Sequence, residues 1–134
     1  MKKVSYKTLF TKLEAILLNL GFTIPKAKAC AEIFANNSRD GVYSHGLNRF
    51  PVFVEYIKKG YINIDAEPSI VKSFGVIEQW DGNLGPGMLN AKSAMQRAIE
   101  LAKQYGGDVD DLAKAQQAKK DEITKTLDEA IIFG

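Results

Sequence analysis

The stretch S-Y-K-T-L-F-T-K-L-E-A-I-L-L-N-L-G, residues 5–21, carries leucine or isoleucine at positions 9, 13, 16, 17 and 20. This spacing of three and four residues places the apolar side chains on one face of an α-helix. Ser5 can cap the start of that helix, and Gly21 can end it as a glycine just past the last turn. The stretch therefore predicts that the chain opens with an amphipathic helix.

Two further helices are predicted downstream. Thr23 and Pro25 are typical of a helix start, and the segment that they open runs to about Asn37. A third helix is predicted to begin near His45 and to end before Gly60. Apolar side chains recur at helical spacing along both segments, which predicts that each helix buries one face. These side chains are Ala27, Cys30, Ala31, Phe34, Phe50, Phe53, Val54 and Ile57.

The pattern changes in S-I-V-K-S-F-G-V-I-E-Q-W-D-G, residues 69–82, where apolar and polar residues alternate. Its β-branched and aromatic residues, with a turn signal at Phe74-Gly75, predict a β-hairpin. After the loop at residues 81–87, a helix is predicted to run to about Tyr105. The apolar residues on one face of this helix are Met88, Ala91, Met95, Ala98, Ile99 and Ala102.

Residues 107–134 are rich in charge and alanine, which predicts a solvated C-terminal helix, with a disordered tail as the alternative. The whole pattern predicts an α+β fold that is mostly helical, with about five helices and one small β-hairpin. We therefore distinguish a helical domain at residues 1–106 from the charged helix at residues 107–134.

The composition is that of an ordinary soluble globular domain, with 46% apolar and 25% charged residues among 134. Eighteen Lys and Arg residues against 16 Asp and Glu give a net charge of +2, so no nucleic-acid partner is predicted. No apolar run could span a bilayer, and Lys7 and Lys12 interrupt the start too early for a signal peptide. The single cysteine, Cys30, is predicted to be a small buried hydrophobe. We therefore expect a cytoplasmic protein with no membrane partner.

His45, the only histidine, precedes Arg49 by four residues. On a helix that starts near Ser44, the two side chains would project from one face. An imidazole can deliver a proton near neutral pH and a guanidinium can hold a carboxylate, so the pair suits the reduction of a ketone beside a carboxylate. In reverse, the same groups would oxidise a 2-hydroxy acid, with Ser44 and Asn48 as neutral hydrogen-bonding neighbours. The spacing alone also fits a surface pair or a histidine at a helix start.

Two other chemistries are not predicted. Ser44 beside His45 does not indicate a hydrolytic triad, because adjacent residues rarely hydrogen-bond as nucleophile and base. The sequence has no second histidine and no cysteine or carboxylate cluster with the spacing of metal ligands, so no metal site is expected.

The loop D-G-N-L-G-P-G, residues 81–87, has three glycines and a proline before a predicted helix. Such a loop can present backbone N–H groups to an anion. It lacks the G-x-G-x-x-G order of a dinucleotide fingerprint. Glycines that adopt positive φ in a hairpin-to-helix connection explain the loop as well.

The stretch G-V-Y-S-H-G-L-N-R-F-P, residues 41–51, with I-E-Q-W-D-G-N at residues 77–83, resembles the malate/L-lactate dehydrogenase family of NAD(P)-dependent oxidoreductases. The stretches V-S-Y-K-T-L, A-C-A-E-I-F-A and A-M-Q-R-A-I-E-L-A match the family in the same order. The resemblance therefore covers about residues 2–106.

The resemblance implies roles for the motif residues. His45 would be the general acid/base, Arg49 would position the acidic group of the substrate, and Ser44 and Asn48 would line the pocket. The loop after the hairpin would lie near the active-site cleft and bind the cofactor, NADH or NADPH. Its residues in question are Asp81, Gly82, Asn83 and Gly85. The implied substrate is a small 2-oxo or 2-hydroxy acid, such as a sugar-derived diketo acid, and the family is typically homodimeric.

The chain departs from the family after Tyr105. Family members are much longer, and they continue into a strand, an N-x-N-H motif and the domain that holds the nicotinamide cofactor. Residues 107–134 resemble instead a helix that returns to the first domain near the family's C-terminal end. We therefore expect residues 1–106 to be the substrate-side domain of a shortened form or a truncated product.

Two functional expectations follow from this departure. As a fragment or shortened form of the enzyme, the chain alone would bind no NAD(P)H and would have little or no dehydrogenase activity. The alternative is a non-catalytic helical module for self-association, because surfaces that other domains cover in the family could leave apolar side chains exposed here.

Overall fold

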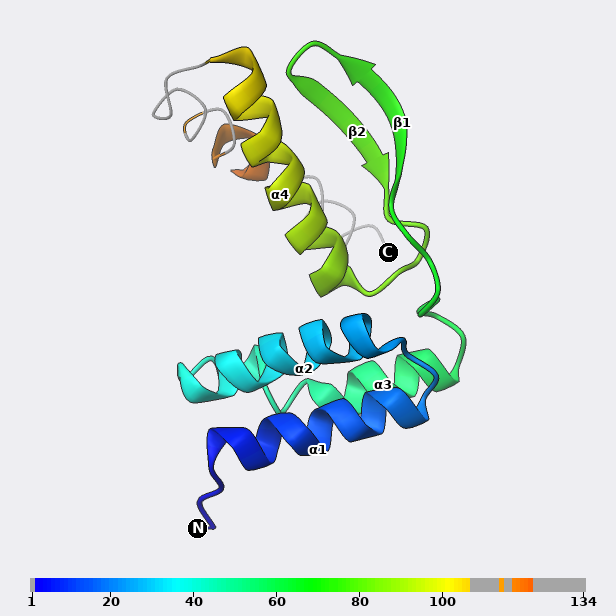
Figure 1. Cartoon of the computed structure of the whole chain (residues 1–134), viewed down its shortest axis with the longest axis vertical. Helices are drawn as coiled ribbons and strands as arrows, with labels where there is room; N and C mark the ends of the chain where they lie inside the picture. Colours follow the sequence, from blue (N-terminus) through cyan, green and yellow to red (C-terminus); the bar gives the residue numbers. More distant parts are fainter. Residues whose placement is uncertain (1, 107–113, 115–116, 122–134) are drawn as a thin grey trace. The chain divides into compact units, whose positions relative to one another are not determined.

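The computed structural model describes residues 2–106, 114 and 117–121. Residues 2–106 form five helices, one of them a 3-10 helix, and one antiparallel hairpin (Figure 1). The predicted α+β, mostly helical class is confirmed. The elements in chain order are α1 (Tyr6–Asn19), α2 (Ile24–Arg39), the 3-10 helix η1 (Tyr43–His45), α3 (Phe50–Lys58), β1 (Ser69–Phe74), β2 (Ile77–Asp81) and α4 (Gly87–Tyr105).

Two compact units, residues 1–95 and 96–134, divide the chain within α4. The first unit holds all elements from α1 to β2 and the start of α4. The charged helix predicted for residues 107–134 lies outside the described residues, except for Lys114 and residues 117–121, which are helical.

Helix α1 begins and ends at the predicted signals. The Ser5 side chain accepts a hydrogen bond from the Thr8 N–H at 3.1 Å, which satisfies one of the free N–H groups of the first turn. Gly21 has a φ of +98°, in the left-handed region that favours glycine, and the Phe22 N–H donates to the Leu17 carbonyl at 3.2 Å. This capped turn lets α2 run back alongside α1 (Figure 1).

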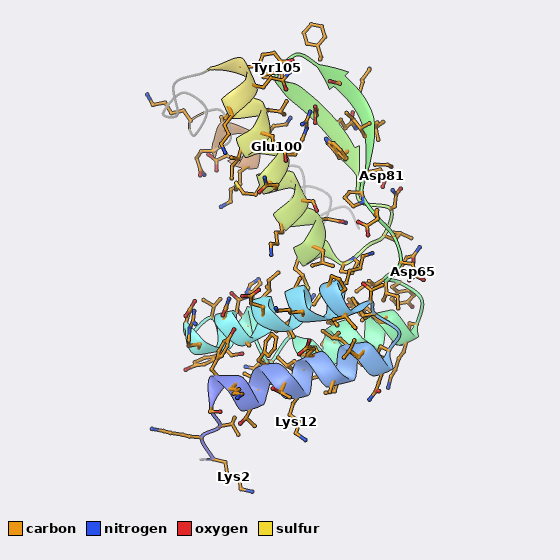
Figure 2. All side chains as sticks on the ribbon, in the orientation of Figure 1. Lys2, Lys12, Asp65, Asp81, Glu100 and Tyr105 are labelled. Carbon is orange, nitrogen blue, oxygen red and sulfur yellow. The ribbon has the colours of Figure 1, made fainter. Side chains whose placement is uncertain are left out.

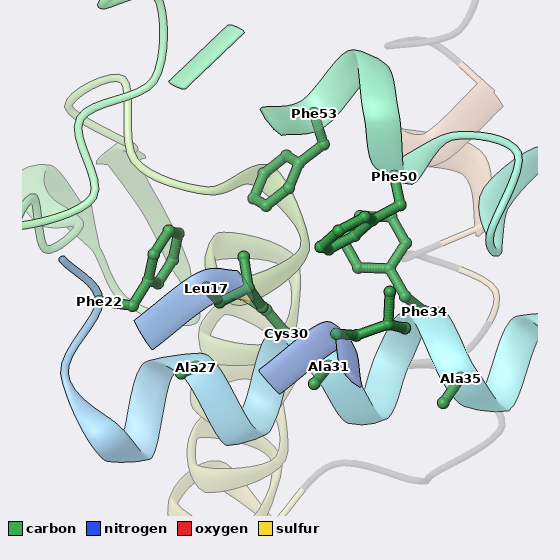
Figure 3. Close-up of a cluster of buried hydrophobic side chains, with 10 residues drawn as sticks. Leu17, Phe22, Ala27, Cys30, Ala31, Phe34, Ala35, Phe50 and Phe53 are labelled. Carbon is green, nitrogen blue, oxygen red and sulfur yellow. The ribbon is translucent and has the colours of Figure 1, made fainter. Parts of the chain in front are cut away.

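The core lies between α1, α2 and α3 (Figure 3). The Phe34 ring stands edge-on to Phe50 with centroids 5.1 Å apart and lies 5.3 Å from the Phe53 ring, an arrangement that aromatic pairs favour. Small residues on α2 let the neighbouring helices approach closely. The buried side chains of this core are Leu13, Leu17, Phe22, Ala27, Cys30, Ala31, Phe34, Ala35, Phe50 and Phe53.

Helix α3 begins at Phe50, so the prediction that it begins near His45 is wrong. Pro51 is the physical reason, because in a helix from His45 its nitrogen would have to donate to the Leu47 carbonyl, and proline has no N–H. The Phe50 N–H donates to that carbonyl instead at 3.2 Å, and Pro51 falls in the first turn of α3. His45 and Arg49 are therefore not one turn apart on a single α-helix.

Lys26 anchors the linker from α3 to β1 on helix α2. Its Nζ donates to the carbonyls of Ile64 and Ala66 at 3.1 Å each and lies 2.7 Å from Oε1 of Glu67. The Lys26 side chain is only 17% exposed, whereas that of Glu67 is 72% exposed. Asp65, labelled in Figure 2, belongs to this linker. The linker therefore enters the hairpin from a fixed point on α2.

The predicted hairpin is confirmed, with a turn at Gly75, whose φ is +58°. Ser69 of β1 lies opposite Asp81 of β2, and an irregularity at Val71 interrupts the register. Both strands are largely exposed, although they carry apolar side chains. The exposed apolar residues of the hairpin are Ile70, Val71, Phe74, Val76, Ile77 and Trp80.

Candidate functional site

The turn between α2 and α3 holds the four residues that the sequence predicts to handle substrate. Ser44 and His45 lie in η1, and Asn48 and Arg49 lie in the turn that follows. All four residues are exposed. Arg49 is also the N-cap residue of α3, where its carbonyl accepts the Phe53 N–H at 3.1 Å. The turn therefore gathers the predicted polar groups on one short exposed segment.

The His45 ring is held by its neighbour in the sequence. Oγ of Ser44 lies within hydrogen-bond distance, 3.0 Å, of Nδ1 of His45. The general expectation that such adjacent residues rarely bond therefore does not hold here. A neutral imidazole has one donor and one acceptor nitrogen, so the role of Nδ1 in this bond sets the role of Nε2. Because the bond occupies Nδ1, proton exchange with a ligand would take place at Nε2.

Two side chains at the end of α2 hold the main chain of the turn, although neither is among the site residues that the sequence predicts. Nδ2 of Asn37 donates to the His45 carbonyl at 3.1 Å. Oγ of Ser38 accepts from the Leu47 N–H at 2.8 Å and donates to the Phe34 carbonyl at 3.0 Å. Small polar residues at a helix end before a turn commonly bond to nearby backbone groups. This pattern is the one signal in the sequence that points to the role of these two residues.

Gly46 lies between these two anchoring points and is buried. A Cβ atom at this position would lie 2.8 Å from the Ser38 nitrogen and 3.0 Å from its Cα. Both are main-chain atoms of α2, so they cannot move aside as a flexible side chain could. The glycine of the S-H-G motif therefore allows the turn to lie directly on α2.

The loop after β2 contains the residues predicted to bind the cofactor, and Figure 2 shows Asp81 at the end of that strand. Oδ1 of Asp81 accepts from the Asn83 N–H at 2.7 Å, and the Gly85 N–H donates to the Gly82 carbonyl at 2.8 Å. These bonds form two successive tight turns, so the loop has a defined shape without a ligand.

The side chain of Asn83 ties the same loop to the start of the hairpin. Its Nδ2 donates to the Glu67 carbonyl at 2.7 Å and lies 2.9 Å from Oγ of Ser69. From α4, Nδ2 of Asn90 donates to the Gly82 carbonyl at 3.1 Å. Asn83 therefore acts as a structural residue of the linker, the loop and β1.

The interpretation that glycines supply the positive φ angles of this loop needs correction. Asn83 and Leu84 are the residues with positive φ, at +51° and +59°. Asn adopts this region readily, whereas Leu does so only when its surroundings impose it. Gly85 instead allows its backbone to lie close to that of Gly82, because a Cβ there would lie 3.1 Å from the Gly82 oxygen. At Gly82 an added Cβ would meet the amide of Asn90.

The two predicted groups of site residues have separate partners. The described hydrogen bonds of residues 43–49 run to α2 and α3 or stay within the turn. Those of residues 81–85 run to the linker, to β1 and to α4 or stay within the loop. The described contacts thus do not bring the histidine turn and the glycine loop together.

The described side chains form no group suited to a metal ion. Within residues 2–106, 114 and 117–121, no three His, Cys, Asp or Glu side chains are grouped so that they could hold a metal ion. In the same part of the chain, no helix has both the length and the apolar character needed to cross a membrane.

Cys30 is fully buried in the core, as predicted. Its burial raises the pKa of the thiol from 9.0 to about 12, and the nearby Lys26 ammonium opposes this shift only in part. The thiol is therefore a neutral core group across the ordinary pH range and takes no part in the exposed turn.

Comparison with known sequences identifies a family. The profile of malate/L-lactate dehydrogenase matches residues 4–109. A 2,3-diketo-L-gulonate reductase of Pasteurella multocida is 47% identical over 104 residues, and one of Escherichia coli is 45% identical over the same length. Each match covers 78% of this chain and 31% of the relative, so the chain spans less than a third of these relatives.

Solved structures agree with this match. A malate dehydrogenase of Entamoeba histolytica superimposes with a TM-score of 0.73 at 35% identity, over 78% of this chain and 29% of that one. A delta1-piperideine-2-carboxylate reductase of Pseudomonas syringae gives 0.67 at 26% identity, over 78% of this chain and 32% of that one. The matched 78% of this chain thus recurs in oxidoreductases of which it covers only 29% and 32%.

Proposed function

Since the chain belongs to the malate/L-lactate dehydrogenase family, we propose that it is the substrate-side part of an NAD(P)H-dependent oxidoreductase that interconverts a small 2-oxo acid and its 2-hydroxy acid. The names of the curated relatives make 2,3-diketo-L-gulonate the first substrate to test. One observation carries the proposal: the exposed His45 imidazole is anchored through Nδ1 by Ser44, within the motif that resembles the family.

In this proposal His45 is the general acid. Nε2 of the protonated ring gives its proton to the carbonyl oxygen of the 2-oxo acid, and that oxygen becomes the hydroxyl group of the product. A nicotinamide cofactor held by the rest of the enzyme would supply the hydride to the carbonyl carbon, and it would accept the hydride in the oxidative direction. In the oxidative direction, Nε2 of the neutral ring takes the hydroxyl proton. Ser44 can stay bonded to Nδ1 throughout, because a hydroxyl both donates and accepts and can follow the protonation of the ring.

Arg49 is the proposed clamp for the substrate carboxylate. A guanidinium can hold a carboxylate through two parallel hydrogen bonds and keeps its charge at any working pH. Arg49 lies at the N-terminus of α3, where the positive end of the helix dipole adds to the attraction for an anion. Asn48 and Ser44 would line the pocket as uncharged hydrogen-bonding groups.

The described residues do not by themselves fit a nicotinamide dinucleotide. The side chains of Asp81 and Asn83 are engaged within the loop and with the linker and β1. We propose that Gly82 and Gly85 border the cofactor through their backbone only. We propose further that the chain alone does not hold NADH or NADPH.

Binding of a 2-oxo acid tests the substrate role. NMR titration with pyruvate, and with 2,3-diketo-L-gulonate, is expected to shift signals of His45 and its turn. Arg49→Ala should weaken the affinity about tenfold, the effect of losing a hydrogen bond to a charged group. Arg97→Ala removes another guanidinium, one paired with Glu100 in the second unit, and should leave the affinity unchanged. Equal affinity in the Arg49 variant and the parent would contradict the proposal.

Turnover tests the cofactor statement separately. The purified chain is mixed with NADH or NADPH and a 2-oxo acid, and the nicotinamide absorbance is followed. We expect no decrease in absorbance above that of a His45→Ala variant. Turnover that depends on His45 would show that the chain holds a productive cofactor by itself.

Self-association is the second candidate function, and the hairpin is the observation that favours it. Phe74 is 84% exposed and Val71 is 60% exposed, on a two-stranded sheet that would be marginal in water by itself. Exposed apolar clusters commonly mark protein interaction sites. We propose a homodimer that covers these side chains, and analytical ultracentrifugation tests it.

We also propose a cytoplasmic location. The chain has one cysteine, a buried free thiol that can form no disulfide within the chain, so nothing in its cysteine content points to an oxidising compartment. Fractionation of cells that produce the tagged protein would test this proposal.

A further inference from the structure

We propose that Asn37 and Ser38, at the C-terminal end of α2, are positioning residues that set the direction of the His45 imidazole. The inference rests on the proposed acid/base function of His45, but its geometry is independent of any ligand. Neither residue is proposed to contact the substrate. Both act through the main chain of the turn that carries the histidine.

The two side chains hold consecutive peptide groups on either side of Gly46. Asn37 donates to the carbonyl of His45, which belongs to the first peptide, at 3.1 Å. Ser38 accepts from the Leu47 N–H, which belongs to the second, at 2.8 Å. With both peptide planes fixed, the φ and ψ angles of Gly46 are fixed between them. Gly46 would otherwise be the most flexible point of the turn.

The Ser38 hydroxyl has its orientation determined by the core. Its one hydrogen goes to the Phe34 carbonyl at 3.0 Å, so a lone pair faces the Leu47 N–H. Phe34 is 2% exposed and packs on Phe50 and Phe53 of α3. The aromatic core thus supports α3, and through Ser38 it also supports the turn that precedes α3.

The position of the main chain determines the direction of the His45 ring, because the bond from Ser44 to Nδ1 forms between adjacent residues. A small rotation of the peptide between them would separate Oγ from Nδ1. Asn37 fixes the carbonyl on the far side of His45 and so limits this rotation. We therefore infer a relay from α2 to the turn and from the turn to the direction of the imidazole ring.

The ring nitrogens of His45 provide a direct readout, since the chain has one histidine. In the parent, 15N NMR of the ring is expected to show an Nδ1 signal typical of a hydrogen-bonded nitrogen. Asn37→Ala and Ser38→Ala should shift this signal toward that of an imidazole without the bond and give about fivefold weaker binding of pyruvate, the effect of one net hydrogen bond. Ser38→Thr keeps the hydroxyl and should restore both readouts.

Asn36→Ala is the matched control. Its side chain lies in the same helical turn but accepts from the Tyr6 hydroxyl at 2.9 Å, away from the histidine turn. It should lose some thermal stability and keep the parental ring signals. If Asn37→Ala and Ser38→Ala also keep those signals, the positioning role is refuted.

Failure of the proposed function gives a different result. If the parent binds neither pyruvate nor 2,3-diketo-L-gulonate while the ring signals still respond to Asn37→Ala, the positioning role stands and the substrate role fails. Should Ser38→Ala not fold, Asn37→Ala decides the question, because the Asn37 bond lies in an exposed part of the turn.

Discussion

Oγ of Ser44 lies 3.0 Å from Nδ1 of His45, so the Nδ1 atom of an exposed imidazole is engaged by the residue next to it in the chain. This bond gives the ring a preferred direction without any help from a buried carboxylate. It leaves Nε2 available to a ligand. The proposed proton delivery to a carbonyl oxygen requires such an available ring nitrogen.

Removal of the Ser44 hydroxyl should therefore change the orientation of the His45 ring and leave the fold intact. Ser44→Ala is expected to shift the 15N NMR signal of Nδ1 away from its hydrogen-bonded value and to weaken binding of a 2-oxo acid about fivefold, the effect of one hydrogen bond. Ser44→Thr should resemble the parent. Ser73→Ala on β1 removes a hydroxyl from the hairpin and should change neither readout. An unchanged Nδ1 signal in Ser44→Ala would show that the bond does not orient the ring.

Gly46→Ala should destabilise the protein by about 1–3 kcal/mol, the typical cost of forcing an extra carbon into a packed site. The new Cβ would lie 2.8 Å from the backbone nitrogen of Ser38, which cannot yield without disturbing α2. Gly87→Ala is the control, since an added Cβ there meets nothing within 4 Å. Urea denaturation of both variants measures the difference. Equal midpoints would show that the turn does not rest on α2.

Lys26→Met should cost about 1–3 kcal/mol of stability, because it leaves two backbone carbonyls of the linker without their donor. Glu67→Gln should cost less than about 1 kcal/mol, since its carboxylate is largely exposed and the ion pair is screened by water. The control Lys28→Met changes an exposed lysine on the same helix. If urea denaturation showed the Glu67 variant to be less stable than the Lys26 variant, this ranking would be wrong.

The sequence predicted the helices and the hairpin because their signals are local. Leu13 and Leu17 recur at helical spacing in α1, and both are buried. The start of α3 was misplaced because apolar spacing continues through the turn, whereas Pro51 decides which N–H reaches the Leu47 carbonyl. The positive φ of Leu84 was missed for a similar reason, since tertiary bonds to the loop impose it against the preference of the residue.

The candidate site was predictable only in part. His45 and Arg49 stood out by their chemistry and their family motif, but their relation depends on a turn that periodicity does not describe. Asn37 and Ser38 carry no chemical signature, because their role comes from contacts across eight and nine residues that only the folded chain makes. The predicted roles of Asp81 to Gly85 at the cofactor remain predictions.

Phe74→Ser should weaken self-association about tenfold if the hairpin forms the dimer interface, as expected for the loss of an aromatic anchor. Phe74 is the most exposed large apolar residue of the hairpin, at 84%. Val4→Ser is the control, because Val4 is 65% exposed but lies before α1. Sedimentation equilibrium gives the dissociation constants. A parent that stays monomeric at high concentration would exclude the hairpin as a homodimer interface.

Cys30 should make the stability of the protein fall as the pH rises from about 9 to 12. Burial raises the pKa of its thiol to about 12 in the folded state from 9.0, so in this range the folded chain holds a proton that the unfolded chain has lost. Stability then decreases by up to about 1.4 kcal/mol for each pH unit. Cys30→Ala removes this contribution while other groups titrate as before. Urea denaturation at pH 8 and pH 10 should therefore show a smaller loss in the variant than in the parent, and equal losses would mean that the thiolate forms in the folded core.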